Sequence, residues 1–161
     1  FDAVLCLGGP LNHLVYEKAR EKAAKELVRV ARRGAPIFVS VIGRLAVLMN
    51  TIVFIWPELE ADPDVWTKYV LTGDYLGGYG FTASHFYSPE ELKAEFRDRA
   101  QIVEMIGLEG MFSTHAEEYD NVYEMGKYNK ILWETHLKTC TNPYLVGISE
   151  HFMLICRKKA D

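Results

Sequence analysis

The sequence predicts a single α/β domain, and three consecutive segments near its beginning carry that prediction. Residues 3–7 form a short apolar run followed by a Gly-Gly-Pro turn, and residues 37–42 form a second run of β-branched and aromatic side chains. Neither run alternates with charged residues, which is typical of parallel strands buried on both faces. Residues 16–33 lie between them and repeat apolar side chains at helical spacing: Ala19, Ala23, Leu27, Val30 and Ala31. The segments therefore predict a β-α-β unit with a right-handed crossover.

The composition and charge of the chain exclude some classes of binding partner. The chain has 161 residues and a net charge of -4, enough length for one domain with a sizeable core. Lysine and arginine are mixed with acidic residues rather than gathered in one block, so no nucleic-acid partner is predicted. Cys6, Cys140 and Cys156 are isolated in the sequence, as expected of reduced thiols in a cytoplasmic protein.

Residues 45–57 are very apolar and carry no charge. The stretch is shorter than the roughly 20 residues that cross a bilayer, so it predicts a buried or pocket-covering helix and no membrane partner. The chain begins at Phe1 and shows neither the charged region nor the cleavage site of a signal peptide. We therefore expect a cytoplasmic protein, cut from something longer.

The rest of the chain continues the alternation of helices and strands. The clearest local signal is Ser88-Pro89-Glu90-Glu91, in which Ser88 caps a helix and Glu91 completes a capping box. The predicted elements are helices over 45–56 and 64–71, a loop over 73–80, the capped helix to residue 98 with Leu92 and Phe96 buried, a strand over 100–106, a helix start at Thr114 with Glu117, a helix over 121–139, a turn or short helix opened by Asn142-Pro143, and a closing strand over 150–157.

This order of elements resembles the second half of the class I S-adenosylmethionine-dependent methyltransferases, and three segments support the resemblance. They are Phe1–Leu14, with its Leu-Gly-Gly-Pro-Leu-Asn-His-Leu; the passage Ala24–Ile42, with Ala-Arg-Arg-Gly where the family often has Leu-(Arg/Lys)-Pro-Gly; and His85–Leu92, followed by residues 102–108 and 149–157. The segments resemble a branch that acts on small molecules. The resemblance implies strands 4 to 7 of that fold, with the last strand antiparallel and between the two before it, and with helical insertions.

The resemblance also implies a domain assignment and a cofactor. Residues 1–161 would be the C-terminal part of a methyltransferase domain, whose glycine-rich loop and ribose-binding acid would precede Phe1. The Gly-rich stretch 73–80 does not follow a predicted strand, so it is not interpreted as that loop. The cofactor, S-adenosyl-L-methionine, would lie against the end of the first strand, beside Cys6, Leu7, Gly8, Gly9 and Leu11. The alternative is a plain turn between a strand and a helix.

Four side chains are candidates for the acceptor side of the reaction. Methyl transfer from a sulfonium is an in-line displacement, in which a base is needed only for a protonated, weakly nucleophilic acceptor. His85 is the candidate catalytic base, and Tyr87 points to the same side if that segment is extended. His13, Arg44 and Tyr87 are the candidate substrate-binding residues. The alternatives are a structural histidine at position 13, a solvated arginine at 44, and a surface histidine with a packed aromatic at 85 and 87.

The insertions at residues 44–86 and 109–148 would shape the acceptor pocket in this reading. The first contains aromatic side chains that either line that pocket or pack a lid: Trp56, Trp66, Tyr69, Tyr75, Tyr79 and Phe81. In the second, His136 and Cys140 are four residues apart on a predicted helix, a spacing that zinc can use. Two ligands do not make a zinc site, so no metal is predicted.

Two functional hypotheses remain. The first is methyl transfer to a small-molecule acceptor by a longer enzyme, of which this chain is a part that is inactive alone. The second is a non-catalytic truncated or partner subunit that retains the second half of the fold and forms a homodimer or pairs with the missing N-terminal half. Half of a nicotinamide-binding Rossmann domain fits less well, because it does not predict an antiparallel final strand.

Overall fold

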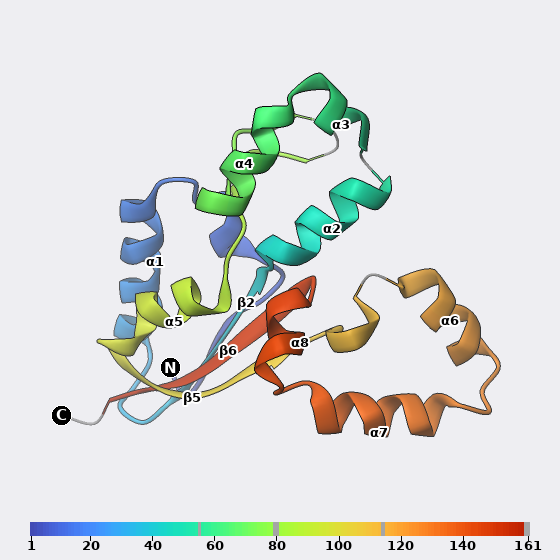
Figure 1. Ribbon diagram of the computed structural model, residues 1–161. Coiled ribbons are helices and arrows are strands. Elements are labelled where there is room, and N and C mark those ends of the chain that lie inside the picture. The colour runs from blue at the N-terminus through green and yellow to red at the C-terminus, as the bar shows by residue number, and fades with distance from the viewer. Residues whose placement is uncertain (55, 79–80, 114, 160–161) are drawn as a thin grey trace.

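The computed structural model describes residues 1–54, 56–78, 81–113 and 115–159. Its main sheet has the strand order β1-β2-β6-β5, formed by β1 (Val4–Cys6), β2 (Pro36–Ile42), β6 (His151–Lys158) and β5 (Ala100–Gly107) (Figure 1). β1 is parallel to β2, whereas β6 is antiparallel to both of its neighbours. The prediction that the last strand is antiparallel and lies between the two before it is therefore confirmed.

The helix α1 (Glu17–Val30) connects the two parallel strands, as predicted, but its buried face differs from the predicted stripe. Arg20, Ala24 and Val28 are buried, whereas Ala23 and Leu27 are only partly buried at the margin of the core. The predicted buried stripe omitted Arg20 because it included apolar side chains only. Its guanidinium is buried with carbonyl and carboxylate partners, which compensate for the loss of water.

The helix α5 (Pro89–Arg97) begins at the predicted capping box. Glu91 N donates to Ser88 Oγ at 3.3 Å, and Ser88 N donates to Glu91 Oε2 at 2.7 Å. Leu92 and Phe96 are fully buried, as predicted. Because Pro89 has no N–H, only three backbone N–H groups at this helix end lack a helical partner. The capping box satisfies two of them, which fixes where α5 starts.

Two predicted elements are wrong. The predicted loop over 73–80 contains β3 (Asp74–Tyr75), which pairs with β4 (Ser84–His85), a two-residue ladder too short to show a periodic pattern. The predicted helix over 121–139 is divided into α6 (Ala116–Glu124) and α7 (Asn129–Thr139). Gly126 lies between them with a φ of 69°, a left-handed conformation that ends a helix. The predicted cap at Thr114 lies outside the described residues.

The remaining short elements complete the connections. They are η1 (Pro10–His13), α2 (Arg44–Phe54), α3 (Trp56–Ala61), α4 (Pro63–Thr72), η2 (Gly110–Phe112) and α8 (Pro143–Ile148). Asn142 caps α8 through its side chain, in agreement with the predicted Asn-Pro start. In the part of the chain that the structure describes, no helix is both long enough and apolar enough to cross a bilayer.

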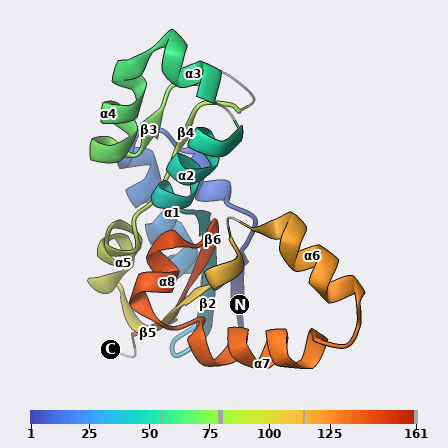
Figure 2. The ribbon, with the colours of Figure 1, turned by 45° about the vertical axis from the view of Figure 1, so that its right-hand side comes forward.

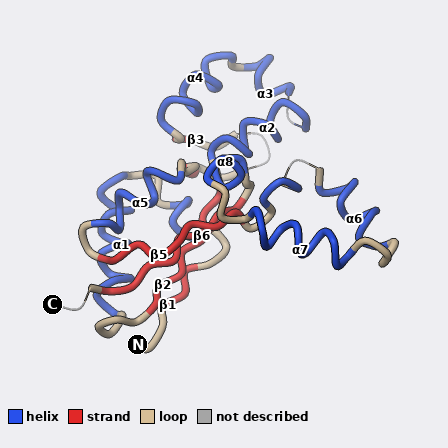
Figure 3. Tube along the Cα trace, turned by 60° about the horizontal axis from the view of Figure 1, so that its bottom comes forward, coloured by secondary structure: helices blue, strands red, loops and turns tan. Residues whose placement is uncertain are grey.

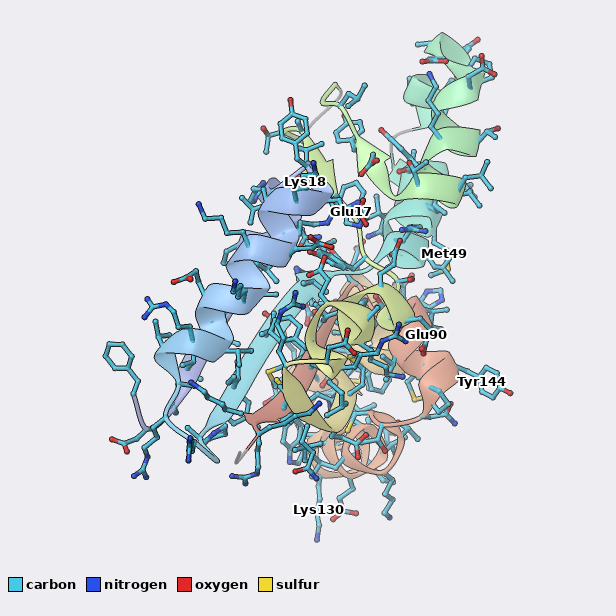
Figure 4. The ribbon with its side chains drawn as sticks, turned by 90° about the vertical axis from the view of Figure 1, so that its left-hand side faces the viewer. Glu17, Lys18, Met49, Glu90, Lys130 and Tyr144 are labelled. Carbon is cyan, nitrogen blue, oxygen red and sulfur yellow. The ribbon has the colours of Figure 1, made fainter. Side chains whose placement is uncertain are left out.

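The two faces of the sheet are covered unequally. α1 and α5 lie on one face, as the view onto them in Figure 4 shows, and α8 packs beside β5 with Tyr144 pointing outward. Figures 2 and 3 show no described helix lying across the opposite face. On the covered face Ile37, Val39 and Leu154 are 0% exposed, whereas on the other face Leu5 is 65% exposed. The described chain therefore buries one face of its sheet and leaves apolar side chains on the other.

Candidate functional site

The carboxyl ends of β1, β2 and β5 meet at one edge of the sheet. Because β6 is antiparallel, it begins at this edge: His151 pairs with Ile42, and Phe152 pairs with Gly107. Helices α2, α3 and α4 lie above the edge (Figure 1), together with β3 and β4, which are labelled in Figure 2. In open α/β sheets, ligands bind outside the carboxyl ends of the strands, so this edge is the candidate site.

β1 ends at this edge in a turn that requires glycine. Gly8 and Gly9 have φ values of 80° and 77°, and Gly8 N donates a 2.9 Å hydrogen bond to Ser40 Oγ. A Cβ on Gly9 would lie 3.0 Å from Asn12 Oδ1 and 3.4 Å from the Ile42 side chain. The turn therefore combines a left-handed backbone with a close approach to β2, neither of which a larger residue tolerates.

The predicted cofactor-binding residues surround this turn with different degrees of exposure. Leu7 is 51% exposed and Gly8 is exposed, whereas Gly9 and Leu11 are buried. Cys6 is partly buried, and this burial raises the pKa of its thiol. The structure brings the five residues together at the carboxyl end of β1, and their contact with a cofactor stays a prediction.

Asn12 fixes the turn, and sequence reasoning missed it. Its fully buried side chain donates from Nδ2 to the carbonyls of Ile42 (3.1 Å) and His85 (2.8 Å), and Oδ1 accepts from Ile42 N at 2.9 Å. A single amide thus joins η1 to the end of β2 and to β4. The available signal was an asparagine directly after a Gly-Gly-Pro turn, but its partners lie 30 and 73 residues away.

His85 and Tyr87 point to the same side, as predicted, with their rings 4.8 Å apart in an edge-on contact. His85 is 3% exposed and its Nδ1 lies 2.7 Å from Asp74 Oδ1; burial lowers its pKa despite this hydrogen bond. Tyr87 is fully buried, and its hydroxyl donates to the Glu95 carboxylate at 3.3 Å. A general base must reach the acceptor, so the catalytic role of His85 stays a prediction that its burial does not favour.

His13 and Arg44 lie at the same edge in very different surroundings. His13 is exposed; its Nδ1 is 3.4 Å from Ser84 Oγ and its ring stacks on Phe81 at 6.0 Å. The Arg44 guanidinium instead binds both carboxylate oxygens of Glu91 at 2.5 and 2.6 Å, and Nε donates to the Phe86 carbonyl at 3.2 Å. Of the predicted substrate-binding residues, His13 alone keeps an exposed side chain.

The predicted aromatic lid is divided by burial. Tyr69, Tyr75 and Phe86 form a buried cluster between α2, α4 and the β3-β4 pair, with ring centroids 5.1 to 6.4 Å apart. Trp56 is 58% exposed, outside this cluster. The Trp66 side chain and Tyr79 lie outside what the structure describes. The cluster holds α2, α4 and the β3-β4 pair together. These aromatic side chains therefore pack a lid, which is one of the two alternatives given by the sequence.

A second group at the carboxyl edge was not predicted at all. Glu109 follows β5, and His151 begins β6. Glu109 Oε1 lies 2.9 Å from His151 Nδ1, and Oε2 accepts from His151 N at 2.6 Å and from Ser149 Oγ at 3.0 Å. The hydrogen bonds from His151 and Ser149 outweigh burial and lower the pKa of the Glu109 carboxyl. The residues are 40 or more positions apart, so spacing in the sequence gave no signal.

The solved structures include one that shares this architecture. It is the crystal structure of a SAM-dependent methyltransferase from Methanosarcina mazei, which superposes with a TM-score of 0.56 at 16% sequence identity. The superposition covers 100% of this chain and 60% of that protein. This chain has the methyltransferase fold. No protein-family profile and no curated protein sequence matches it.

The methyltransferase fold of this chain spans less than two thirds of the length of that solved protein. Among the described residues, no three histidine, cysteine, aspartate or glutamate side chains gather closely enough to hold a metal ion. Cys140, which has a zinc-compatible spacing from His136 in the sequence, is a buried free thiol whose Sγ donates to the Leu137 carbonyl.

The carboxyl of Glu95, on α5, should make the stability of the protein depend on pH. Burial raises its pKa to about 6, against the favourable charge of Arg20, whose Nε lies 3.4 Å from Oε1 without the alignment of a hydrogen bond. Between pH 4.5 and about 6 the folded state keeps a proton that the unfolded chain releases. We expect this group to lower the free energy of unfolding by about 2 kcal/mol as pH rises through that window.

Urea unfolding of the wild type and Glu95→Gln at a series of pH values tests this expectation. The difference in unfolding free energy between the two proteins should change across the window and stay constant above it. An unchanging difference would contradict the raised pKa.

Proposed function

We propose that this chain is the C-terminal part of a longer enzyme that transfers the methyl group of S-adenosyl-L-methionine to a small-molecule acceptor. The observation that carries the proposal is the sheet order β1-β2-β6-β5 with an antiparallel β6. The fold that contains this sheet superposes, over the whole chain, on a solved SAM-dependent methyltransferase. The glycine turn after β1 lies at the carboxyl end of that strand, the edge at which open α/β sheets bind ligands. The cofactor would therefore lie at this turn, with its methyl group toward β2.

The unequal covering of the sheet supports the view that an N-terminal half completes it. Parallel strands are normally covered on both faces, but here one face leaves Leu5 exposed and Phe38, Met153 and Ile155 only partly buried. β1 is also an edge strand with a free side. These strands would correspond to strands 4 to 7 of a complete sheet, and the missing strands would pair along β1.

An apolar groove beside β1 points the same way. It has a volume of about 490 Å³ and lies between α1 and the end of β1, lined by Cys6, Leu11, Leu14, Ala23, Leu27 and Val30. A helix preceding β1 in the longer protein would fill this groove and bury the partly exposed stripe of α1. The groove explains why α1 carries apolar side chains beyond its buried face.

Calorimetric titration of S-adenosyl-L-methionine tests the proposal in two proteins: this chain and the same chain extended upstream in its source gene. We expect binding by the extended protein and none by the 161-residue chain. Binding by neither would overturn the methyltransferase proposal and favour the non-catalytic partner subunit, for which the free edge of β1 is the supporting observation. Binding by the short chain alone would show that the cofactor site lies elsewhere.

A further inference from the structure

The pair formed by Glu109 and His151 has the geometry of a histidine prepared to accept a proton. An ionised carboxylate can only accept hydrogen bonds, so the proton of the 2.9 Å contact belongs to His151 Nδ1. In the neutral ring, Nε2 then carries the lone pair. Within the described part of the chain no hydrogen bond to Nε2 is found, and the side chain is 34% exposed.

The support behind Glu109 is rigid. Its own N and Gly110 N both donate to Ser149 Oγ, at 3.3 and 3.0 Å, and Ser149 is fully buried. Its carboxylate also accepts from His151 N at 2.6 Å, so both carboxylate oxygens bind the residue that they orient. Positioning of this kind holds an imidazole in one tautomer and one orientation.

The position of His151 suits an acceptor that lies beside the proposed cofactor. His151 pairs with Ile42, and a Cβ on Gly9 would touch the Ile42 side chain. β6 is thus two strands from β1, which places His151 about 10 Å from the glycine turn. The glycine turn and His151 therefore lie on either side of the end of β2, at the same edge of the sheet.

A cavity shared with Glu109 indicates what the acceptor looks like. It has a volume of about 280 Å³ and lies between η2, α6 and α7, and His151 adjoins it through its hydrogen bond to Glu109. Its walls are Leu108, Glu109, Phe112, Tyr119, Asp120, Trp133 and His136. The rings occur in pairs, Phe112 with Tyr119 at 4.5 Å and Trp133 with His136 at 5.7 Å. Aromatic walls of this size fit one small planar ring system.

We propose that His151 is the catalytic base of the methyl transfer, that Glu109 positions it, and that the acceptor is a small phenol. The inference rests on the proposed function for the source of the methyl group. The phenolic proton passes to His151 Nε2, the oxygen forms a bond to the methyl carbon, and the carbon–sulfur bond breaks with its electron pair left on sulfur. The sulfonium becomes a neutral thioether, and the imidazolium returns its proton to water.

The electrostatics of the pair agree with this role. The Glu109 hydrogen bond raises the pKa of His151 against the effect of burial, and the charges of Glu109 and Glu150 raise it further. A stronger base accepts the phenolic proton more readily, and an imidazolium formed there lies against a carboxylate.

The test uses para-nitrophenol as the probe, because its phenolate absorbs visible light, and the full-length protein. We expect binding to lower the apparent pKa of the probe by about one unit, a tenfold gain in the bound phenolate. His151→Gln should abolish this shift, and Glu109→Gln should reduce it, because each removes part of the pair. His115→Gln, an exposed histidine of the same insertion, is the matched control and should leave the shift unchanged.

An unchanged shift in a folded His151→Gln protein would overturn the inference, as would the absence of any shift in the wild type. If His151→Gln does not fold, the His151 ring can be followed by NMR in the wild type and in Glu109→Gln. The ring signal should titrate with the bound probe in the wild type, and a ring that does not respond would overturn the inference.

The probe also separates this inference from the proposed function, because its ionisation requires no cofactor. Conversion to para-nitroanisole with S-adenosyl-L-methionine measures methyl transfer. A shift in the probe's pKa without conversion would reject methyl transfer alone. Conversion that survives His151→Gln would reject the base alone.

Discussion

Asn12→Leu should destabilise the protein by about 2–4 kcal/mol, although the two side chains have similar volumes. The substitution removes the Asn12 partner of the Ile42 amide and of the His85 carbonyl at a fully buried position, whereas the Ile42 carbonyl keeps its hydrogen bond from Tyr87 N. Buried backbone groups without a hydrogen bond carry the full cost of lost hydration, and here two are affected together. Urea unfolding followed by circular dichroism measures the change.

Asn121→Leu is the control, because Asn121 is exposed on α6 and the same chemical change there should shift stability by less than about 0.5 kcal/mol. Equal effects of the two substitutions would show that Asn12 does not join the glycine turn to β2. A stable Asn12→Leu protein would also show that the glycine turn at the proposed cofactor site keeps its geometry without Asn12.

Arg44→Met should cost about 2–3 kcal/mol of stability, even with no substrate present. The substitution removes the guanidinium from the Glu91 carboxylate and from the carbonyls of Thr72 and Phe86. The Arg44 side chain is 11% exposed and that of Glu91 39%, so water recovers part of the lost interaction. The hydrogen bonds from Ser88 and Arg44 outweigh burial and lower the pKa of Glu91, so Arg44→Met removes part of what keeps this carboxylate charged.

Thermal unfolding monitored by circular dichroism checks this result, with Arg29→Met as the control. Arg29 pairs with Glu26 on the exposed surface of α1, and pairs of that kind contribute little. If Arg44→Met unfolds at the wild-type temperature, the arginine is free to bind an acidic substrate group as the sequence predicted. The expected loss of stability would assign it to the junction of α2, α4 and α5.

Gly73 explains why this junction admits so little change. It ends α4 in a left-handed conformation with a φ of 76°, and a Cβ there would run into the Arg44 guanidinium and the Phe86 carbonyl. From the sequence, this glycine was predicted to begin a loop. Its actual role is to let α4 and the arginine of α2 approach the same short strand.

Much of the fold could be predicted because its signals are local. The capping box at Ser88 and Glu91, the apolar runs of β2 and β6, and the glycine turn after β1 all depend on neighbouring residues. The buried face of α1 could not be predicted, because the charge of the buried Arg20 is balanced by Glu95 of a distant helix. Local sequence patterns indicate the secondary structure that a segment prefers. A buried ion pair depends in addition on a partner residue that is distant in the sequence.

The candidate site shows the same division. The sequence located the carboxyl end of β1, because glycines after a strand mark an edge of the sheet. It missed Asn12, Glu109 and His151, whose roles arise from contacts across 30 or more residues. It also chose His85, a histidine beside an aromatic, where only the fold reveals that the ring is buried.

The strand order also has a consequence for synthesis on the ribosome. Among the described strands of the main sheet, β5 pairs with β6 alone, and β6 is translated after the other three. A nascent chain can pair β1 with β2 early, but β5 leaves the exit tunnel without a neighbour and keeps both of its edges open. Native pairing of β5 must wait until residues 151–158 emerge and insert between two strands already present. Such late, non-local insertion is slow, and the waiting strand is the part of the chain most exposed to misassembly and most in need of chaperone protection.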